Sequence, residues 1–337
     1  MLLTVLSCGG DTAVEQPAAK RTVLMKAKAV DPLAGQRPPP VVPITNVHEH
    51  IQSADTIPDL LAAMDNVGIE RTVILGAPIY TFLLGRYGFY GHDTNNVAVL
   101  DMAAAHPDRL IPFVVAYPED EHAVEKLRGY IAMGAKGVKL FAGHGAKHGD
   151  GPFHTMPLTD PRLDAIYTVI EEHNLPVLFH VNSTKYRAEF EQVLTAHPQM
   201  KVLCPHFCLT LRNTDKVRTL LERHKNLWMD ISFGWVQFQA EGYRRIDKKP
   251  RTVAKLIADF PDRYTFGTDL VLTPHPSKNA EWITMNSAFY RDLVERKRYE
   301  FYGLSGGPLA GLALPSALQT RLYRDNAEAW LHGPSRK

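Results

Sequence analysis

Continuous apolar runs, separated by helical stretches, recur along most of the chain. Strands that are apolar on both faces are typical of a buried parallel sheet, whereas half-exposed strands alternate apolar and polar residues. The eight runs are residues 41–47, 71–76, 110–116, 137–141, 176–180, 201–204, 227–231 and 264–267. Because helical stretches follow the runs in turn, the pattern favours a closed barrel over an open sheet. We therefore predict an α/β fold, a (β/α)8 TIM barrel.

The barrel is expected to occupy residues 41–337 as one domain. Residues 279–296 and 315–331 indicate additional C-terminal helices after the eighth strand. Residues 1–40 are assigned to an apolar leader and a disordered linker, because residues 9–40 are rich in Ala, Pro and Gly, a composition typical of tethers.

The first eight residues end in Val-Leu-Ser-Cys, which resembles the end of a bacterial lipoprotein signal in which Cys8 receives the lipid. No Lys or Arg precedes this apolar stretch, and the stretch is shorter than a signal peptide. A remnant of a lipoprotein signal and a short disordered tail therefore stay open as alternatives. The first implies a bacterial cell envelope location, with the lipid anchor as the membrane contact, and the second a cytoplasmic one.

Composition argues against several classes of partner. The formal net charge is +2 and no basic patch emerges, so no nucleic-acid partner is expected. No run of about 18 apolar residues occurs, so no membrane-spanning helix is predicted. Three cysteines are too few for a disulfide framework, and we expect Cys204 and Cys208 to be free buried thiols. The expected partner is a small-molecule substrate, with a homodimer as a further hypothesis.

A histidine pair, His48 and His50, lies at the end of the first predicted strand. Residues two apart on a strand point the same way, so both rings can reach one ion. By itself the pair carries little weight, because 15 histidines among 337 residues predict roughly 0.7 such pairs by chance.

Three further polar residues follow other predicted strands. His180 ends the fifth apolar run, His206 follows the sixth, and Asp269 follows the eighth. The carboxyl ends of barrel strands meet at one mouth, so these side chains are expected to join the histidine pair. Three or four nitrogen and oxygen ligands with an open position are typical of a catalytic zinc site.

Five motifs resemble, in order and spacing, those of the amidohydrolase superfamily. They are Asn46-Val-His-Glu-His50, Gly137-Val-Lys-Leu-Phe141, Pro176-Val-Leu-Phe-His180, Cys204-Pro-His206 and Phe266-Gly-Thr-Asp269. More narrowly, they resemble the amidohydrolase-related branch, which holds lactonases and other hydrolases, aromatic and semialdehyde decarboxylases, and a hydratase. The resemblance covers residues 43–332.

By this resemblance, His48, His50, His180 and Asp269 would bind one divalent metal ion, with zinc favoured. Asp269 would also take a proton from the metal-bound water, and His206 would polarise a substrate carbonyl or position the water. The physical chemistry agrees, since zinc lowers the pKa of bound water to about 7. Two-metal relatives carry a carbamylated lysine on the fourth strand, so a second ion would require that modification at Lys139.

Lys139 lies inside an apolar strand, where an unpaired ammonium is costly. We expect Asp230 or Asp269 to hold it, or an anionic substrate to contact it. Asp230 ends the seventh strand and is either part of the same mouth or a structural carboxylate.

Two long predicted loops, residues 77–94 and 142–160, follow the second and fourth strands on the side where barrels carry active sites. In the first loop, Arg86 and Tyr87 are candidates for substrate binding. The second loop holds three histidines, which form either a second metal site or, as we favour, a solvated group: His144, His148 and His154.

Residues and resemblance together predict a metal-dependent hydrolase, in which metal-bound hydroxide attacks an ester, lactone or amide carbonyl. The first alternative is a metal-dependent non-oxidative decarboxylase of an aromatic or unsaturated acid, with Lys139 or Arg86 holding the carboxylate. Some decarboxylases of this branch carry Glu in place of the first histidine of the pair, so His48 favours hydrolysis. The second alternative, a non-catalytic envelope barrel that binds a ligand, is disfavoured by the complete ligand set.

Overall fold

The computed structural model describes residues 30–76, 91–141, 156–234 and 236–333. Within them, parallel strands form one sheet in the order β8-β7-β6-β5-β4-β3-β2-β1-β9. These strands are β1 (Ile44–Ile51), β2 (Ile69–Leu75), β3 (Leu110–Val115), β4 (Gly137–Leu140), β5 (Pro176–Phe179), β6 (Lys201–Cys204), β7 (Leu227–Asp230), β8 (Tyr264–Thr265) and β9 (Leu270–Leu272). β8 pairs with β7 and β9 pairs with β1, so residues 264–272 close the sheet, and the predicted TIM barrel is confirmed.

The strands are apolar because they are covered on both sides. Every residue of β1, β3, β4, β5 and β6 is buried. One side faces the barrel interior and the other faces the surrounding helices, which explains the lack of polar alternation in the sequence.

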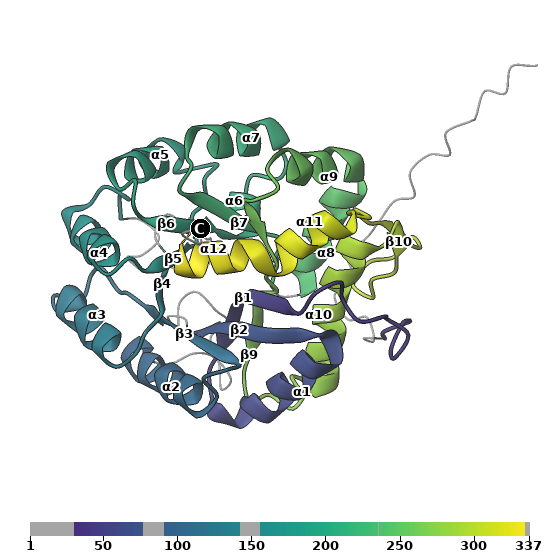
Figure 1. Ribbon diagram of the computed structural model, residues 1–337, viewed down its shortest axis with the longest axis horizontal. Helices are drawn as coiled ribbons and strands as arrows, with labels where there is room; N and C mark the ends of the chain where they lie inside the picture. The colour runs from purple at the N-terminus through teal and green to yellow at the C-terminus, as the bar shows by residue number, and fades with distance from the viewer. Residues whose placement is uncertain (1–29, 77–90, 142–155, 235, 334–337) are drawn as a thin grey trace, which may run out of the picture.

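Helices surround the strands as a ring (Figure 1). They are α1 (Ile57–Val67), α2 (His92–Ala105), α3 (Ala123–Ala132), α4 (Pro161–Glu172), α5 (Arg187–Ala196), α7 (Thr214–Arg223), α8 (Val236–Asp247), α9 (Pro250–Asp259) and α10 (Ala280–Glu295). α4 begins with Pro161 in its first turn, and the Asp160 carboxylate accepts a hydrogen bond from the Arg162 amide. The sequence pattern did not predict α8, which is a second helix between β7 and β8.

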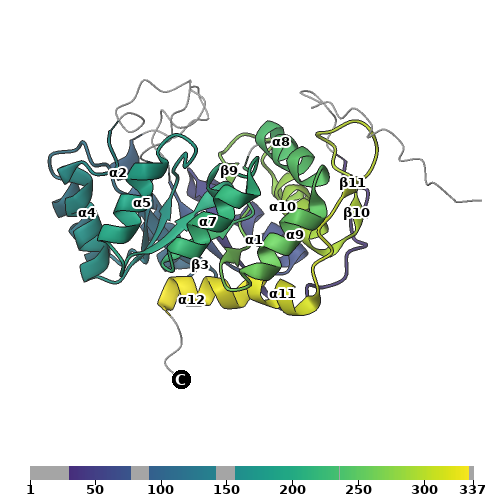
Figure 2. The ribbon, with the colours of Figure 1, turned by 90° about the horizontal axis from the view of Figure 1, so that it is seen from above.

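The C-terminal segment covers the end of the barrel where the strands begin. It consists of α11 (Ser316–Thr320), one π-helical turn (Arg321–Asp325) and α12 (Asn326–His332), and Figure 2 shows it along one end of the barrel. Trp330 is fully buried against the interior, beside Phe113, and its indole donates to the carbonyl of Lys201 at the start of β6. The opposite end, where the strands finish, is therefore the end that carries the candidate site.

Part of the predicted linker packs on the barrel. The Arg37 guanidinium forms ion pairs with Asp31 and with the buried Asp292 of α10, and Arg291 donates to the carbonyl of Pro38. Residues 1–29, including Cys8, lie outside the described residues, so the leader stays a prediction.

A short antiparallel pair, β10 (Arg298–Tyr299) and β11 (Leu309–Ala310), follows α10. No helix among the described residues is both long and apolar enough to span a bilayer.

Candidate metal centre

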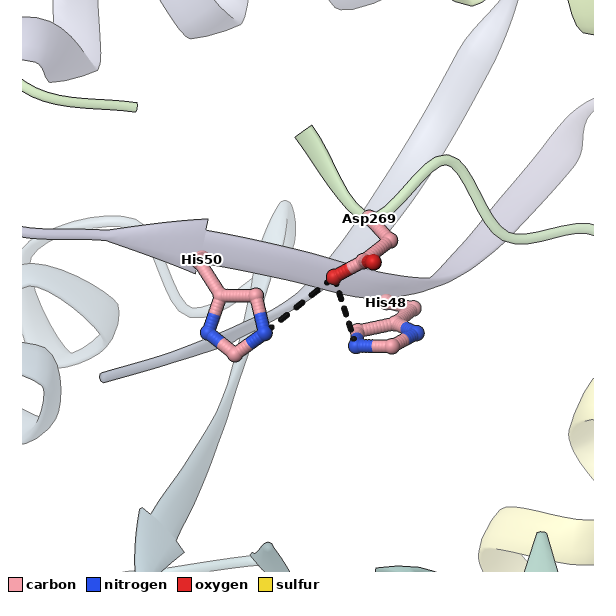
Figure 3. Close-up of side chains that lie close together, drawn as sticks. All are labelled: His48, His50 and Asp269. Carbon is pink, nitrogen blue, oxygen red and sulfur yellow. Dashed lines mark ion pairs between the residues drawn. The ribbon is translucent and has the colours of Figure 1, made fainter. Parts of the chain in front are cut away.

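Three of the predicted site residues lie together at the mouth of the barrel. His48 and His50 project from β1, and Asp269 lies between β8 and β9. One carboxylate oxygen, Oδ1 of Asp269, is 3.0 Å from Nε2 of His48 and 3.2 Å from Nε2 of His50, as Figure 3 shows. The three ligand atoms lie within 4.8 Å of one another, a spacing that suits a common metal ion.

The backbone brings Asp269 to the histidine pair. The Asp269 amide donates to the carbonyl of His48 at 2.7 Å, which ties residues 266–269 to β1. Asp269 itself has a left-handed φ of 54°. This conformation is uncommon for a non-glycine residue, so the surrounding structure must hold it in place.

The hydrogen bonds of the two imidazoles make their inner nitrogens ligand atoms. Nδ1 of His50 is 3.1 Å from the carbonyl of Gly76, and Nδ1 of His48 is 2.9 Å from Oδ2 of Asp230. Both partners accept, so a ring that binds a metal ion through Nε2 would keep its hydrogen on Nδ1. The two Nε2 atoms and the Asp269 carboxylate converge, which suits a cation. The donor set therefore fits a divalent metal ion.

Electrostatics agree with a cation site. Burial, helped by the charge of Lys139 and opposed by Asp269, lowers the pKa of His50 to about 3, so its ring is neutral at physiological pH. Burial alone would raise the pKa of Asp269, but His48, His50 and His206 outweigh it and hold the pKa well below its ordinary value. Asp269 is therefore an anion beside these imidazoles.

Lys139 lies within the site, fully buried in β4. Its ammonium is 3.0 Å from Nε2 of His48 and 4.7 Å from the ring centre of Phe141. Burial lowers the pKa of Lys139 to about 8, against the opposing charges of Asp269 and Asp230. These two carboxylates are the ones expected to hold it, but its hydrogen bond is to His48, where the ammonium would compete with a metal ion for Nε2.

Asp230, at the end of β7, connects two site histidines. Its Oδ2 accepts from His48, while its Oδ1 accepts from the His206 amide at 2.8 Å and from the Ser232 hydroxyl at 2.7 Å. Of the two roles left open by the sequence, the geometry favours a carboxylate that orients the site histidines. Ser232 was not recognised from the sequence, and no motif distinguished it.

His206 follows β6 in an unusual turn. Residues 206–209 all have left-handed φ values, from 52° to 58°, and none is glycine. A left-handed residue other than glycine costs roughly 1–2 kcal/mol, so this turn needs strong local support. The turn directs Nδ1 of His206 at the Ser232 carbonyl, 2.9 Å away, and Nε2 to within 3.5 Å of Oδ2 of Asp269. Burial lowers the pKa of His206.

His180, the fourth predicted ligand, follows β5. It lies beside His206, with ring centres 5.0 Å apart, and its amide donates to Leu140. It is therefore at the same mouth as the three clustered ligands, although it is not one of the three residues whose ligand atoms lie within 4.8 Å of one another.

Comparison with known proteins identifies the family. The family profile described as amidohydrolase matches residues 90–333. The chain belongs to the amidohydrolase family. The match begins after β1, so His48 and His50 lie outside it, and their link to the family site rests on geometry. No curated protein matches this amidohydrolase.

Several solved structures share its fold. An uncharacterised TIM-barrel protein from Bordetella bronchiseptica is 15% identical, with a TM-score of 0.56 over 86% of this chain and 99% of that one. A 2,6-dihydroxybenzoate decarboxylase from Rhizobium is 14% identical, with a TM-score of 0.55 over 86% and 98%. The 5-carboxyvanillate decarboxylase of Novosphingobium aromaticivorans, complexed with manganese and a nitrobenzoic acid, is 12% identical, with a TM-score of 0.53 over 86% and 96%.

Family membership and the donor set together support a metal-dependent enzyme of the amidohydrolase superfamily. Several sequence-based candidates lie outside the described residues and stay predictions: Arg86, Tyr87, His144, His148 and His154.

One expectation about the site is wrong. Cys204 and Cys208 are joined by a disulfide and are not free thiols. The turn after Pro205 brings the two cysteines together, which a predicted strand ending at residue 204 did not indicate.

Replacing Asp230 with Asn is expected to weaken metal binding about 10–100-fold, as loss of an outer carboxylate does at other metal sites. The amide loses the charge that fixes the Nδ1–H tautomer of His48. Titration of the apoprotein with metal would measure the change. Ser232→Ala is the graded control, because it removes one hydroxyl from Asp230 and keeps the carboxylate. Equal affinities of wild type and Asp230→Asn would contradict the orienting role.

Gly234→Ala is expected to disturb Asp269 directly. Gly234 has a φ of +75°, and a Cβ there would lie 2.6 Å from Oδ2 of Asp269. Left-handed strain and this collision predict about 2 kcal/mol of lost stability, together with lower metal content. The control is Gly129→Ala in the exposed face of α3, where a Cβ meets no atom within 4 Å and stability should rise by roughly 0.5–1 kcal/mol. Thermal unfolding and elemental analysis would test the pair.

Proposed function

We propose that this amidohydrolase is a hydrolase that cleaves an ester, lactone or amide bond of a small molecule, using one zinc ion held by His48, His50, His180 and Asp269. When bound, such an ion polarises the scissile carbonyl and lowers the pKa of water. The observation that carries the proposal is the position of Asp269, whose two oxygens face different partners. Oδ1 contacts the histidine pair, and Oδ2 is 3.5 Å from Nε2 of His206.

Asp269 is suited to accept a proton from the attacking water. It is an anion, and its location between the ligand histidines and His206 lets one carboxylate both hold the ion and receive the proton. A general base within reach of the reacting water contributes about 10²–10⁴-fold to the rate.

His206 is suited to orient the water or the substrate through Nε2. Its Nδ1 donates to the Ser232 carbonyl, so Nε2 of the neutral ring accepts hydrogen bonds and makes none to another described residue. An acceptor orients water, whereas polarising a carbonyl requires a donor. Of the two roles expected for His206, this tautomer supports orientation.

A decarboxylase is the second candidate. The buried ammonium of Lys139 supports it, because a substrate carboxylate beside the ion needs a cation to hold it. Two of the similar structures are decarboxylases of aromatic acids. The substrate would then be an aromatic or unsaturated acid.

The two candidates differ in their products. The zinc-loaded protein would be incubated with a panel of esters, lactones and N-acyl amides and, separately, with hydroxybenzoates. Hydrolysis in ¹⁸O-labelled water would incorporate one label into the acid product, which supports the proposal. Release of CO₂ from an acid, without turnover of the ester, lactone and amide panel, would refute hydrolysis and support the decarboxylase.

We also propose that the protein is exported and lipid-anchored through Cys8. The Cys204–Cys208 disulfide supports this location, because disulfides persist in oxidising compartments. Fractionation of cells should find the protein with membranes, and the Cys8→Ala variant in the soluble fraction. Wild-type protein in the cytosolic fraction would refute the proposal.

A further inference from the structure

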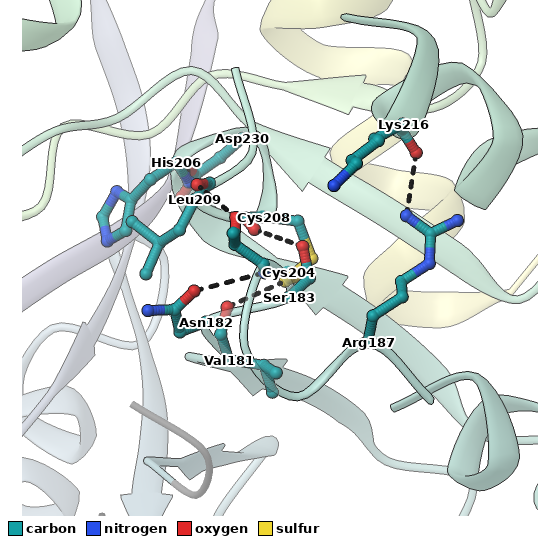
Figure 4. The surroundings of a disulfide bond; sticks show 11 residues. Val181, Asn182, Ser183, Arg187, Cys204, His206, Cys208, Leu209, Lys216 and Asp230 are labelled. Atoms are coloured by element: carbon teal, nitrogen blue, oxygen red, sulfur yellow. Dashed lines mark hydrogen bonds between the residues drawn. A yellow bond between two sulfur atoms is a disulfide. The ribbon is translucent and has the colours of Figure 1, made fainter. Parts of the chain in front are cut away.

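The disulfide lies in the segment that carries His206. Cys204 is the last residue of β6, and Cys208 is the third of the four consecutive left-handed residues. The bond therefore closes the turn around His206, as Figure 4 shows. Nothing else in the sequence of this turn favours its conformation, since it contains no glycine.

Other contacts also hold the turn. The amides of Leu209 and Thr210 donate to the carbonyls of His206 and Phe207. The carbonyl of Cys208 accepts a hydrogen bond of 2.6 Å from the Ser183 hydroxyl, and the Phe207 ring packs against Phe233 and Tyr264. These contacts fix the outer side of the turn. The covalent bond fixes the distance between its two ends, which determines where the residues between them point.

The ring of His206 follows its backbone closely. Its amide donates to Oδ1 of Asp230 and its Nδ1 donates to the Ser232 carbonyl. If the turn relaxes toward right-handed φ values, both donors move away from their acceptors, and Nε2 moves away from Asp269.

We infer that the Cys204–Cys208 disulfide is a positioning element for His206, which holds the left-handed turn and so directs Nε2 at the metal centre. Both cysteines are fully buried, so the bond is shielded from reductants in the folded protein and acts as a permanent brace. The kinetic consequence rests on the proposed function, whereas the structural consequence does not.

The test uses two variants that both lack the disulfide and differ by one methyl group. Cys204→Ala/Cys208→Ala puts a Cβ on a left-handed residue, and Cys204→Ala/Cys208→Gly removes that cost. If the disulfide only stabilised the fold, the two variants would have the same geometry at His206. A positioning role predicts that glycine restores part of the geometry.

The structural readout is the Nδ1–H signal of His206 in NMR spectra of ¹⁵N-histidine-labelled, metal-loaded protein, assigned with a His206→Gln variant. We expect its exchange with water to be slowest in wild type, faster in the glycine variant and fastest or undetectable in the alanine variant. The corresponding signal of His50, bonded to Gly76, should stay unchanged as an internal control. Equal exchange of the His206 signal in wild type and both variants would overturn the inference.

The kinetic readout is the division of the effect between kcat and KM. We expect the alanine variant to lose about 10²-fold in kcat, the scale of a 1 Å misplacement, with little change in KM and partial recovery in the glycine variant. The expected NMR pattern with an unchanged kcat would support the positioning role and refute the part of His206 in the proposed reaction. If the alanine variant does not fold, reduced wild-type protein takes its place. It would be reduced in mild denaturant and returned to native buffer with its thiols kept reduced.

Discussion

Replacing Asp269 with Asn is expected to lower kcat/KM about 10³-fold, because the amide accepts no proton and carries no charge to balance the metal ion. The carboxylate lies 3.0–3.2 Å from two imidazole nitrogens, so its charge is part of the site itself. Steady-state kinetics on a hydrolysed substrate would measure the change. Elemental analysis of the same variant would separate loss of the base from loss of the ion.

The matched control is Asp262→Asn. Asp262 precedes β8 on the same segment, and its side chain is 63% exposed, so the same chemical change should leave turnover unaltered. Full activity of a folded Asp269→Asn variant would contradict the proposed mechanism. Full activity together with a normal metal content would also leave Asp269 without a necessary role as a ligand.

Removing the metal is expected to abolish turnover and to lower stability. Binding at a hundredfold excess of metal over Kd stabilises a folded protein by about 2.7 kcal/mol, so dialysis against a chelator should lower Tm and re-added zinc should restore it. Elemental analysis should find close to one ion per chain. A ratio near two would contradict the one-metal assignment and favour a carbamylated Lys139.

Two histidine variants give this prediction its control. His50→Ala should lose the ion, because Nε2 of His50 faces Asp269. His122→Ala should retain it, because His122 precedes α3 with its side chain 59% exposed and lies outside the candidate centre. Undiminished turnover of the metal-depleted protein would refute a metal-dependent reaction.

Some of the candidate site was predictable because barrel topology converts positions in the sequence into positions in space. His48, His50, His206 and Asp269 all follow or end apolar runs, and the parallel strands carry them to one mouth. The histidine pair alone was close to chance. Its meaning came from the strand ends that accompany it, which is information about topology rather than about any one motif.

Other parts of the site were hidden from the sequence. The link from Asp230 to His48 joins β7 to β1, which lie far apart in the chain. The disulfide was missed for a local reason, because the predicted strand ends at residue 204 and only the turn after Pro205 brings the sulfurs together.

The sequence by itself predicted the barrel, because continuous apolar strands and their order are local patterns typical of a buried parallel sheet. It predicted the family through the resemblance of five motifs. The tertiary structure decided how the site residues face one another. Lone pairs on His48 and His50 converge on Asp269 because Asp230 and the Gly76 carbonyl take up the outer nitrogens. The left-handed turn at His206 exists because its neighbours and a covalent bond outweigh its intrinsic cost, a balance that no local pattern records.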